Sequence, residues 1–323
     1  MKKIMTDEKI ASLKGTHVTP SQIELIIDHD ADVYGENDAL LLKFRKGVLP
    51  KEHVDAFYDA IIKFAHNKTD NRKNASGHKN PNAAAKTNVM SNIFGYFDKW
   101  TPNQKLMFSK NHRRPKIDVR ETRFNMDYPE LYKKTIPLIE DVDHWYEKTT
   151  PEFYKNQKRK ARQTPFKVAN TVFTTITTNL NYQTALHTDK GDDAEGFGNL
   201  AVIERGEYTG GETCMPQYGV GVDVRTGDVL FMDVHQYHTN LPIVLKTPDA
   251  QRLSIVCYLR TKIWEASKGM PKSVVKRHNK TVRLLTRTLI CEKNKNNKTV
   301  RFLKRALTGG MNKNNKTKKR NPR

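Results

Sequence analysis

Cysteines are few and long apolar runs are absent, and each absence excludes a class of protein. The 323 residues include 3 cysteines, widely spaced and without a Cys-x-x-Cys pair, so neither a disulfide framework nor a zinc knuckle is expected. No window approaches the ~20 consecutive apolar residues that cross a bilayer. The first residues turn polar at Thr6, before an apolar signal core could form. We therefore expect an intracellular protein that is neither secreted nor bound to a membrane, and that is nuclear if its host is eukaryotic.

Phosphate-binding glycine motifs are absent as well. The glycines form no Walker pattern and no dinucleotide fingerprint between a strand and a helix. They are more simply explained as turn residues.

Acidic residues are scarce near the C-terminal end. Of 57 Lys and Arg and 35 Asp and Glu residues, 20 and 2 lie from Lys262 onward, so this segment carries a formal charge of +18 and the rest +4. The segment repeats with a period of 18 residues, because Asn279–Leu289 returns as Asn297–Leu307. Apolar residues in each copy are spaced i, i+3, i+7, which predicts a short amphipathic helix. We expect this basic tail to contact nucleic acid phosphates; a solubilising tail, a nuclear-import signal and a membrane-surface helix stay open.

Helical spacing occurs mostly before residue 165, and strand-like composition after it. Residues 50–65 and 129–146 predict helices, and the Asn/Lys-rich segment 67–88 predicts an exposed loop. Buried strands are expected at 39–44, 172–180, 200–203, 220–224, 229–234 and 253–259. Such short strands between Gly-rich turns are typical of an antiparallel barrel or jelly roll. We expect an α+β fold with an N-terminal mixed region (1–114), a catalytic core (115–265) and a basic tail (266–323).

A His-x-Asp triplet supplies the candidate metal ligands. His187 and Asp189 follow a Thr/Asn-rich strand, where side chains two apart point the same way and can reach one ion. A second triplet, His53-Val54-Asp55, falls in a predicted helix, where residues two apart diverge by ~200°, so we interpret it as a decoy. Two His and one carboxylate on one face of Fe(II) leave positions open for a cosubstrate and oxygen.

The third ligand should come from a distant strand. His235 and His238 both follow the strand at 229–234. His238 is favoured by its sequence context: Gly227-Asp228 precedes a hydrophobic strand, and His238 then begins a His-x-x-x-Pro motif. His235, by contrast, still lies near the end of that strand.

Candidate cosubstrate ligands follow on a later strand. Arg252 and Ser254 face the same side of a strand, so a guanidinium and a hydroxyl could clamp one carboxylate. That carboxylate would be the distal end of 2-oxoglutarate. Asn179, Asn181 and Gln183 share the parity of His187 and are further candidates for contact with the cosubstrate or a base; a purely structural role for them is an equal alternative.

The order of these residues resembles a known family. The matching positions are Arg120–Phe124, His187-x-Asp189, Gly196-Phe-Gly198, Gly210-Gly211, Pro216–Arg225, Gly227-Asp228, His238 and Arg252. Over about residues 115–260 they resemble the Fe(II)/2-oxoglutarate dioxygenases of the TET and base-J-binding-protein group. The resemblance implies a double-stranded β-helix (a cupin-like jelly roll) with helices packed on one side. It also implies iron at His187, Asp189 and His238, and 2-oxoglutarate at Arg252, with O2 as the second cosubstrate.

That family oxidises the C5 methyl of 5-methylcytosine or thymine in DNA, so the resemblance implies DNA as the partner. This sequence contains no Cys-rich region like that of animal TET enzymes and no separate J-binding module, so we expect the basic tail to contribute DNA contacts. Three alternatives stay open: a prolyl or lysyl hydroxylase, a demethylase of N-alkylated bases, and a nucleic-acid-binding protein without activity. The first two share the iron chemistry, because function resides in the pocket.

Overall fold

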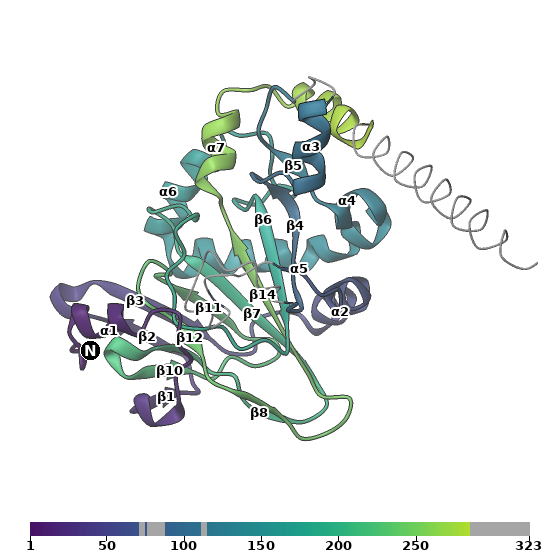
Figure 1. Ribbon diagram of the computed structural model, residues 1–323. Coiled ribbons are helices and arrows are strands. Elements are labelled where there is room, and N and C mark those ends of the chain that lie inside the picture. Colours follow the sequence, from purple (N-terminus) through teal and green to yellow (C-terminus); the bar gives the residue numbers. More distant parts are fainter. Residues whose placement is uncertain (71–74, 76–87, 111–114, 285–323) are drawn as a thin grey trace, which may run out of the picture. The chain divides into compact units, whose positions relative to one another are not determined.

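The computed structural model describes residues 1–70, 75, 88–110 and 115–284 (Figure 1). These residues fall into two compact units, one formed by Met1–Lys99 with Ile117–Lys276, the other by Trp100–Lys116 with the segment from Arg277 onward. The functional division at 114/115 and 265/266 stays a prediction. In the part of the chain that the structure describes, no helix combines the length and the apolar character that a membrane span needs.

Within the described residues, the larger unit contains all the strands and most of the helices. Its helices are α1 (Asp7–Ser12), α2 (Lys51–Ala65), α4 (Arg123–Asp127), α5 (Pro129–Thr149), α6 (Pro151–Ala161) and α7 (Thr261–Ser267). The strands are β1 (Leu25–Ile27), β2 (Ala31–Tyr34), β3 (Leu40–Arg45), β4 (Ser91–Phe97), β5 (Arg120–Glu121), β6 (Thr175–Leu180), β7 (Gly198–Arg205), β8 (Tyr208–Gly210), β9 (Thr213–Met215), β10 (Val220–Val222), β11 (Val229–Met232), β12 (Thr239–Asn240), β13 (Ile243–Leu245) and β14 (Gln251–Tyr258).

Two larger sheets and a separate two-stranded sheet form the jelly roll. The major sheet has the strand order β2-β3-β11-β7-β14-β6-β4-β5, and all its neighbours are antiparallel. The minor sheet has the order β1-β10-β9-β12, and β13 pairs with β8. The expected α+β jelly roll is thus confirmed. Strands from residues before 100 join both sheets, which the sequence analysis predicted only for 39–44.

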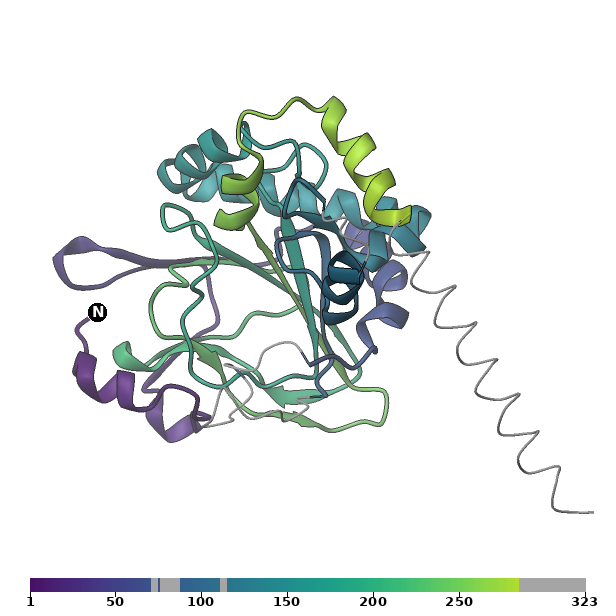
Figure 2. The ribbon, with the colours of Figure 1, turned by 45° about the horizontal axis from the view of Figure 1, so that its top comes forward.

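Helices cover one face of the major sheet (Figure 1, Figure 2). Apolar residues at helical spacing on α2, such as Val54, Phe57 and Ile61, pack in one cluster with Val142 and Tyr146 of α5. The same cluster contains alternate residues of the central strands: Ile176 and Leu180 on β6, Ala201 and Ile203 on β7, and Leu253, Ile255 and Cys257 on β14. Because strand side chains alternate between faces, the residues between these point away from the helices.

The opposite face of the major sheet packs on the minor sheet at one end and is open to cavities at the other. Leu200 and Val202 of β7 share a second core cluster with Val220 and Val222 of β10. Farther along, Thr177 and Asn179 of β6 and the even-numbered residues of β14 line cavities instead. Part of the space between the two sheets is therefore not filled by core side chains and can hold a ligand.

The predicted helices and strands agree with the structure to within a few residues, but two predicted segments fall partly outside the described residues. Of the loop at 67–88, residues 71–74 and 76–87 lie outside; of the tail repeats, only the start of the first copy, 279–284, is described, and it is helical. The basic helical tail therefore stays a prediction. Cys214 and Cys257 are buried free thiols, as expected, and Cys291 lies outside the described residues.

Candidate active site

Two backbone segments bring the candidate metal ligands together. His187 and His238 form an antiparallel bridge, with His187 N donating to His238 O at 3.0 Å and His238 N to His187 O at 2.9 Å. Asp189 N donates to Val234 O at 3.0 Å, so a second backbone hydrogen bond joins the two segments outside the register of this isolated bridge. His238 immediately precedes β12 of the minor sheet, so the site lies where that sheet faces the major one.

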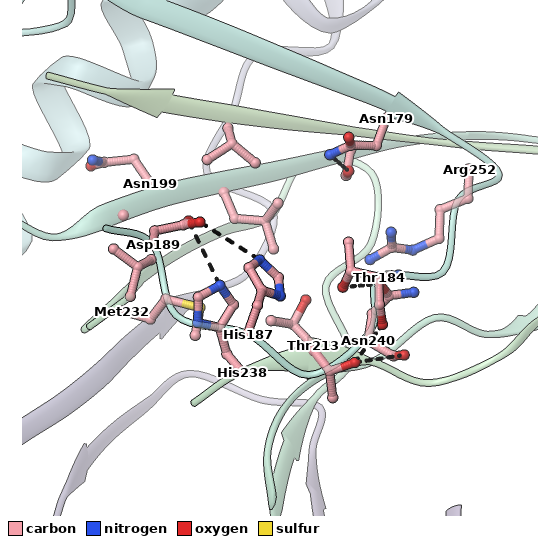
Figure 3. A pocket seen from close by; sticks show the side chains of 16 residues that line it. Asn179, Thr184, His187, Asp189, Asn199, Thr213, Met232, His238, Asn240 and Arg252 are labelled. Atoms are coloured by element: carbon pink, nitrogen blue, oxygen red, sulfur yellow. Dashed lines mark hydrogen bonds and ion pairs between the residues drawn. The ribbon is translucent and has the colours of Figure 1, made fainter. Parts of the chain in front are cut away.

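The three side chains converge on one point (Figure 3). One ligand atom from each of His187, Asp189 and His238 lies within 4.8 Å of the others. His187 Nε2 lies 3.6 Å from one carboxylate oxygen of Asp189, and His238 Nε2 lies 3.7 Å from the other. Both imidazoles are buried, whereas Asp189 is half-buried. This donor set of two imidazoles and one carboxylate suits Fe(II) and leaves coordination positions open.

Backbone carbonyls orient both imidazoles. His187 Nδ1 lies 2.8 Å from Ala185 O, and His238 Nδ1 lies 2.9 Å from Gln236 O. A carbonyl can only accept, so each Nδ1 carries the proton and each Nε2 presents its lone pair toward Asp189 and the other ring. The rings are therefore already held in the tautomer that a metal requires.

The other histidine candidates lie elsewhere. His235 donates toward Asp193 O, with its Nε2 at 3.2 Å, and does not join the cluster. The triplet at His53 lies on α2, as expected for a decoy: His53 Nδ1 lies 2.6 Å from Asp141 Oδ2, while Asp55 accepts from Arg205 at 2.6 Å.

A cavity extends from the triad to Arg252 (Figure 3). The triad lies at one end and the guanidinium at the other, with Asn179 on the side of Arg252. Ser254, which is hydrogen-bonded to Asn179, also lines the cavity. Arg252 is 4% exposed, and burial lowers its pKa below the usual value. Among the described residues its guanidinium makes no hydrogen bond and no ion pair. A buried cation without a protein partner is costly, so the cavity fits an anionic ligand.

Two neighbours make room for and support this end of the cavity. Gly211 has φ +84°, and a Cβ there would lie 2.7 Å from Arg252 Nε, so a glycine is required where the guanidinium passes. Asn179 accepts a hydrogen bond from Ser91 Oγ at 2.7 Å and donates to Ser254 Oγ at 3.2 Å. The Ser254 hydroxyl keeps its own hydrogen to donate into the cavity.

The structure does not bring Asn181 into the cavity. Asn181 Oδ1 accepts from Arg252 N at 2.7 Å, its Nδ2 donates to Ala250 O at 3.2 Å, and its backbone has φ +48°. The Asn181 side chain thus fixes the backbone at the start of β14, on either side of Gln251. Gln183 does not line the cavity either. The prediction assumed that side chains keep alternating along a strand as far as Gln183. Strand β6 ends at Leu180, so the alternation does not extend to Asn181 and Gln183.

Five polar residues of the cavity were missed from the sequence. They are Thr184, Asn199, Thr213, Thr239 and Asn240. Asn240 Oδ1 accepts from both the backbone and the hydroxyl of Thr184 at 2.9 Å, and Asn240 pairs with Thr213 across β12 and β9. Asn240 could have been predicted from the sequence, since it stands two residues after His238 and side chains two apart on a strand share a face. Asn199 offered no such signal.

Comparison with known proteins gives the family. Residues 104–261 match the Tet_JBP family model, described as the oxygenase domain of the 2OGFeDO superfamily. This segment is therefore similar to the oxygenase domains of the TET/JBP family. The superfamily uses Fe(II), 2-oxoglutarate and O2. The matched segment includes His187, Asp189, His238 and Arg252, whose geometry suits that set: three metal donors at one end of a cavity and an unpaired guanidinium at the other.

The curated relatives are much longer proteins. "Bifunctional helicase and thymine dioxygenase JBP2" of Leishmania braziliensis is 32% identical over 263 residues, 79% of this chain and 22% of the relative. "Thymine dioxygenase JBP1" of Trypanosoma brucei brucei is 30% identical over 187 residues, 57% of this chain and 22% of the relative. The chain thus spans about a fifth of the length of these relatives. A solved structure of NgTET1 in complex with 5mC DNA aligns at a TM-score of 0.43 and 13% identity, over 85% of this chain and 100% of that one.

Proposed function

We propose that the chain is an Fe(II)/2-oxoglutarate-dependent dioxygenase that hydroxylates the C5 methyl group of a pyrimidine base in DNA. Thymine is the favoured substrate, because the curated relatives are named thymine dioxygenases; 5-methylcytosine is the second candidate. His187, Asp189 and His238 would bind the iron. The single observation that carries the proposal is the convergence of these three side chains at one end of a cavity that has an unpaired Arg252 at the other.

Each residue has a defined part in this proposal. The iron, when bound with 2-oxoglutarate and O2, supplies the oxidising power that converts a methyl group to a hydroxymethyl group, with succinate and CO2 as coproducts. Arg252 and Ser254 would hold the distal carboxylate of 2-oxoglutarate through charge-assisted and neutral hydrogen bonds. Asn181 would position Arg252 through the backbone of β14.

DNA is the proposed partner. A methyl group on a stacked base is out of reach of a buried site, so a duplex substrate would need its base turned out of the helix, at a cost of a few kcal/mol. The basic tail would add affinity that does not depend on sequence and that falls with salt. We place this activity inside the cell, in the nucleus of a eukaryotic host.

Product analysis tests the proposal. The protein would be incubated with Fe(II), 2-oxoglutarate and duplexes that contain thymine or 5-methylcytosine, and the nucleosides would be examined by mass spectrometry. We expect 5-hydroxymethyluracil or 5-hydroxymethylcytosine, lost in His187→Ala and retained in His235→Ala, because His235 lies outside the triad. The His235→Ala protein is the matched control for loss of an imidazole.

Other outcomes would replace the proposal. Hydroxylation of histone-like or proline-rich peptides alone would make the chain a protein hydroxylase. Demethylation of N-alkylated bases alone would make it a repair enzyme. DNA binding with no succinate formed from 2-oxoglutarate would make it a binding protein without this chemistry.

A further inference from the structure

A cluster of basic residues lies beyond the C-terminal end of α7, on two segments that pack side by side. One segment, 162–172, follows α6, and the other, 266–276, begins in the last turn of α7 and continues past it. Gly269 N donates to Gln163 O at 2.9 Å. Phe166 belongs to an apolar cluster against which residues of the second segment pack, namely Ala266, Met270, Val274 and Val275. These contacts hold the two segments against each other.

The two segments contain basic residues and no acidic one. Their five cations are Arg162, Lys167, Lys268, Lys272 and Lys276. Lys167 is half-buried, and the other four are exposed. Counting Glu265, which directly precedes the second segment, the excess is still four positive charges. Within the residues that the structure describes, none of the five cations forms an ion pair.

The basic residues at the C-terminal end of α6 differ from this cluster, because they are already paired. Lys158 pairs with Glu147 at 2.9 Å. Arg159 and Lys160 pair with Glu195 at 3.2 and 2.7 Å. The carboxylates on this side of the molecule therefore neutralise the charges of α6 and leave those of the two segments available to an external anion.

Lys167 is the member of the cluster that gains most from a counter-ion. Burial, together with the charge of Lys272, lowers the pKa of its ammonium group. The carboxylate of Asp143 opposes this shift, but it already accepts hydrogen bonds from the Tyr154 hydroxyl at 2.9 Å and from Val172 N at 2.8 Å. A partly desolvated cation beside like charges is unfavourable, so an anion bound at this point would stabilise the arrangement.

Helix α7 connects the cluster to the proposed iron site (Figure 1). Its first residue, Thr261, donates from N to Gly191 O at 3.2 Å, and Gly191 stands two residues after Asp189. The 7 residues of α7 rise by ~10 Å, so the cluster begins about that far from the loop that carries Asp189. Along a DNA strand the phosphates are spaced at ~3.4 Å, so this distance corresponds to about three nucleotides.

We propose that this surface, the basic cluster (Arg162, Lys167, Lys268, Lys272 and Lys276), binds the phosphodiester backbone of duplex DNA about three nucleotides from the base that is oxidised. The inference rests on the proposed function but concerns a separate surface, because no member of the basic cluster lines a cavity at the triad. Contacts to phosphates position a protein on a duplex without reading its sequence. The basic cluster would thus hold the flanking duplex while one base is turned out of the helix. A free phosphate ion shares this ligand chemistry.

Salt dependence of duplex binding tests the proposal. A fluorescently labelled duplex would be titrated with the full chain, loaded with Mn(II) and 2-oxoglutarate, at several salt concentrations. Each phosphate contact contributes about 0.9 to the slope of log K against log salt for B-DNA, so Lys167→Gln/Lys272→Gln should lower the slope by about 1.8. Lys272→Gln/Lys276→Gln changes exposed residues alone and should lower it equally, so the test does not depend on the folding of the Lys167 variant.

The matched control is Lys63→Gln/Lys134→Gln, which removes the same charge from exposed lysines on α2 and α5. Its slope should equal that of the parent chain. An unchanged slope in both cluster variants would overturn the proposal, as would an equal fall in the control, because the effect would then come from net charge and not from this surface.

Uncharged methylphosphonates at single positions locate the contact on the DNA. In a duplex with one 5-methylpyrimidine, a methylphosphonate about three nucleotides from that base removes one charge-assisted hydrogen bond. It should weaken binding by the parent chain by about 10-fold and leave binding by Lys167→Gln/Lys272→Gln unchanged, because that variant has already lost the contact. Equal effects on parent and variant at every position would overturn the placement.

Competition separates the possible sources of the phosphate group. Inorganic phosphate should displace the duplex no better than chloride at equal ionic strength; stronger displacement that depends on Lys167 would make the basic cluster a site for a free ion. Binding of phosphatidylserine vesicles that is lost in Lys167→Gln/Lys272→Gln, with duplex binding unchanged, would make it a membrane surface. Either result would overturn the assignment to DNA.

Failure of the inference can be told from failure of the proposed function. Unchanged duplex binding in both cluster variants, with oxidised pyrimidines still formed, would overturn the basic cluster and leave the function in place. Duplex binding that depends on the basic cluster, without oxidation of any pyrimidine methyl group, would support the basic cluster and overturn the function.

Discussion

Replacing Arg252 by methionine should affect stability and cosubstrate binding in opposite directions. The guanidinium is 4% exposed, and among the described residues it pairs with no acid, so it costs free energy until an anion binds. Arg252→Met keeps most of the volume and removes the charge. We expect the free energy of unfolding without ligand to rise by about 1 kcal/mol, which raises Tm by about 2–4 °C. Two charge-assisted hydrogen bonds to a carboxylate would be lost, together about 3 kcal/mol or more, so Kd for 2-oxoglutarate should rise at least ~150-fold.

Thermal unfolding with and without 2-oxoglutarate, in the presence of Mn(II), measures both effects. Arg225→Met is the matched control, because Arg225 is partly buried and paired with Glu204 at 3.0 Å and Asp223 at 2.5 Å. Breaking those pairs should lower Tm and leave the shift caused by 2-oxoglutarate intact. The reasoning is refuted if Arg252→Met lowers Tm as Arg225→Met does, while 2-oxoglutarate still raises it by the parent amount.

Three further substitutions probe the surroundings of the site. Gly211→Ala places a Cβ within 2.7 Å of Arg252 Nε at φ +84°, so calorimetry should show weaker 2-oxoglutarate binding with metal affinity retained; equal loss of both would point to general unfolding. Asn181, whose own φ is +48°, accepts a hydrogen bond from the Arg252 amide. Asn181→Ala removes this acceptor and should lower the free energy of urea unfolding by about 1–2 kcal/mol, whereas Asn181→Asp, which keeps the acceptor, should lower it less. Asp228→Ala leaves two backbone amides without the carboxylate that accepts from both at 2.9 Å, so unfolding should become easier by about 2–4 kcal/mol; a change below 0.5 kcal/mol would contradict this.

Strong local patterns in the sequence predicted the parts of the fold that depend on them. The apolar spacing on residues 50–65 and the buried runs at 229–234 and 253–259 correspond to α2, β11 and β14. Strand β4, by contrast, contains Asn92 and Gly95 and follows a polar loop, so its composition did not predict a strand. Asn92 is buried there because its side chain donates to Ala65 O and Asn67 O. The formation of strand β4 thus depends on tertiary contacts, which cannot be seen in a single sequence.

The same distinction applies to the site. His187, Asp189 and His238 could be chosen from the sequence because a short ligand spacing and a strand parity select them. Asn181 was assigned to the cosubstrate by extending that parity past the end of β6, where the backbone turns through a left-handed residue.

Anomalous scattering from crystals grown anaerobically with Fe(II) tests the central claim most directly. The account predicts one strong iron peak between His187 Nε2, His238 Nε2 and the Asp189 carboxylate, absent from His187→Ala crystals and present in His235→Ala crystals. A peak at His235 instead, or crystals of the parent chain that contain 2-oxoglutarate but no iron between those three side chains, would contradict it.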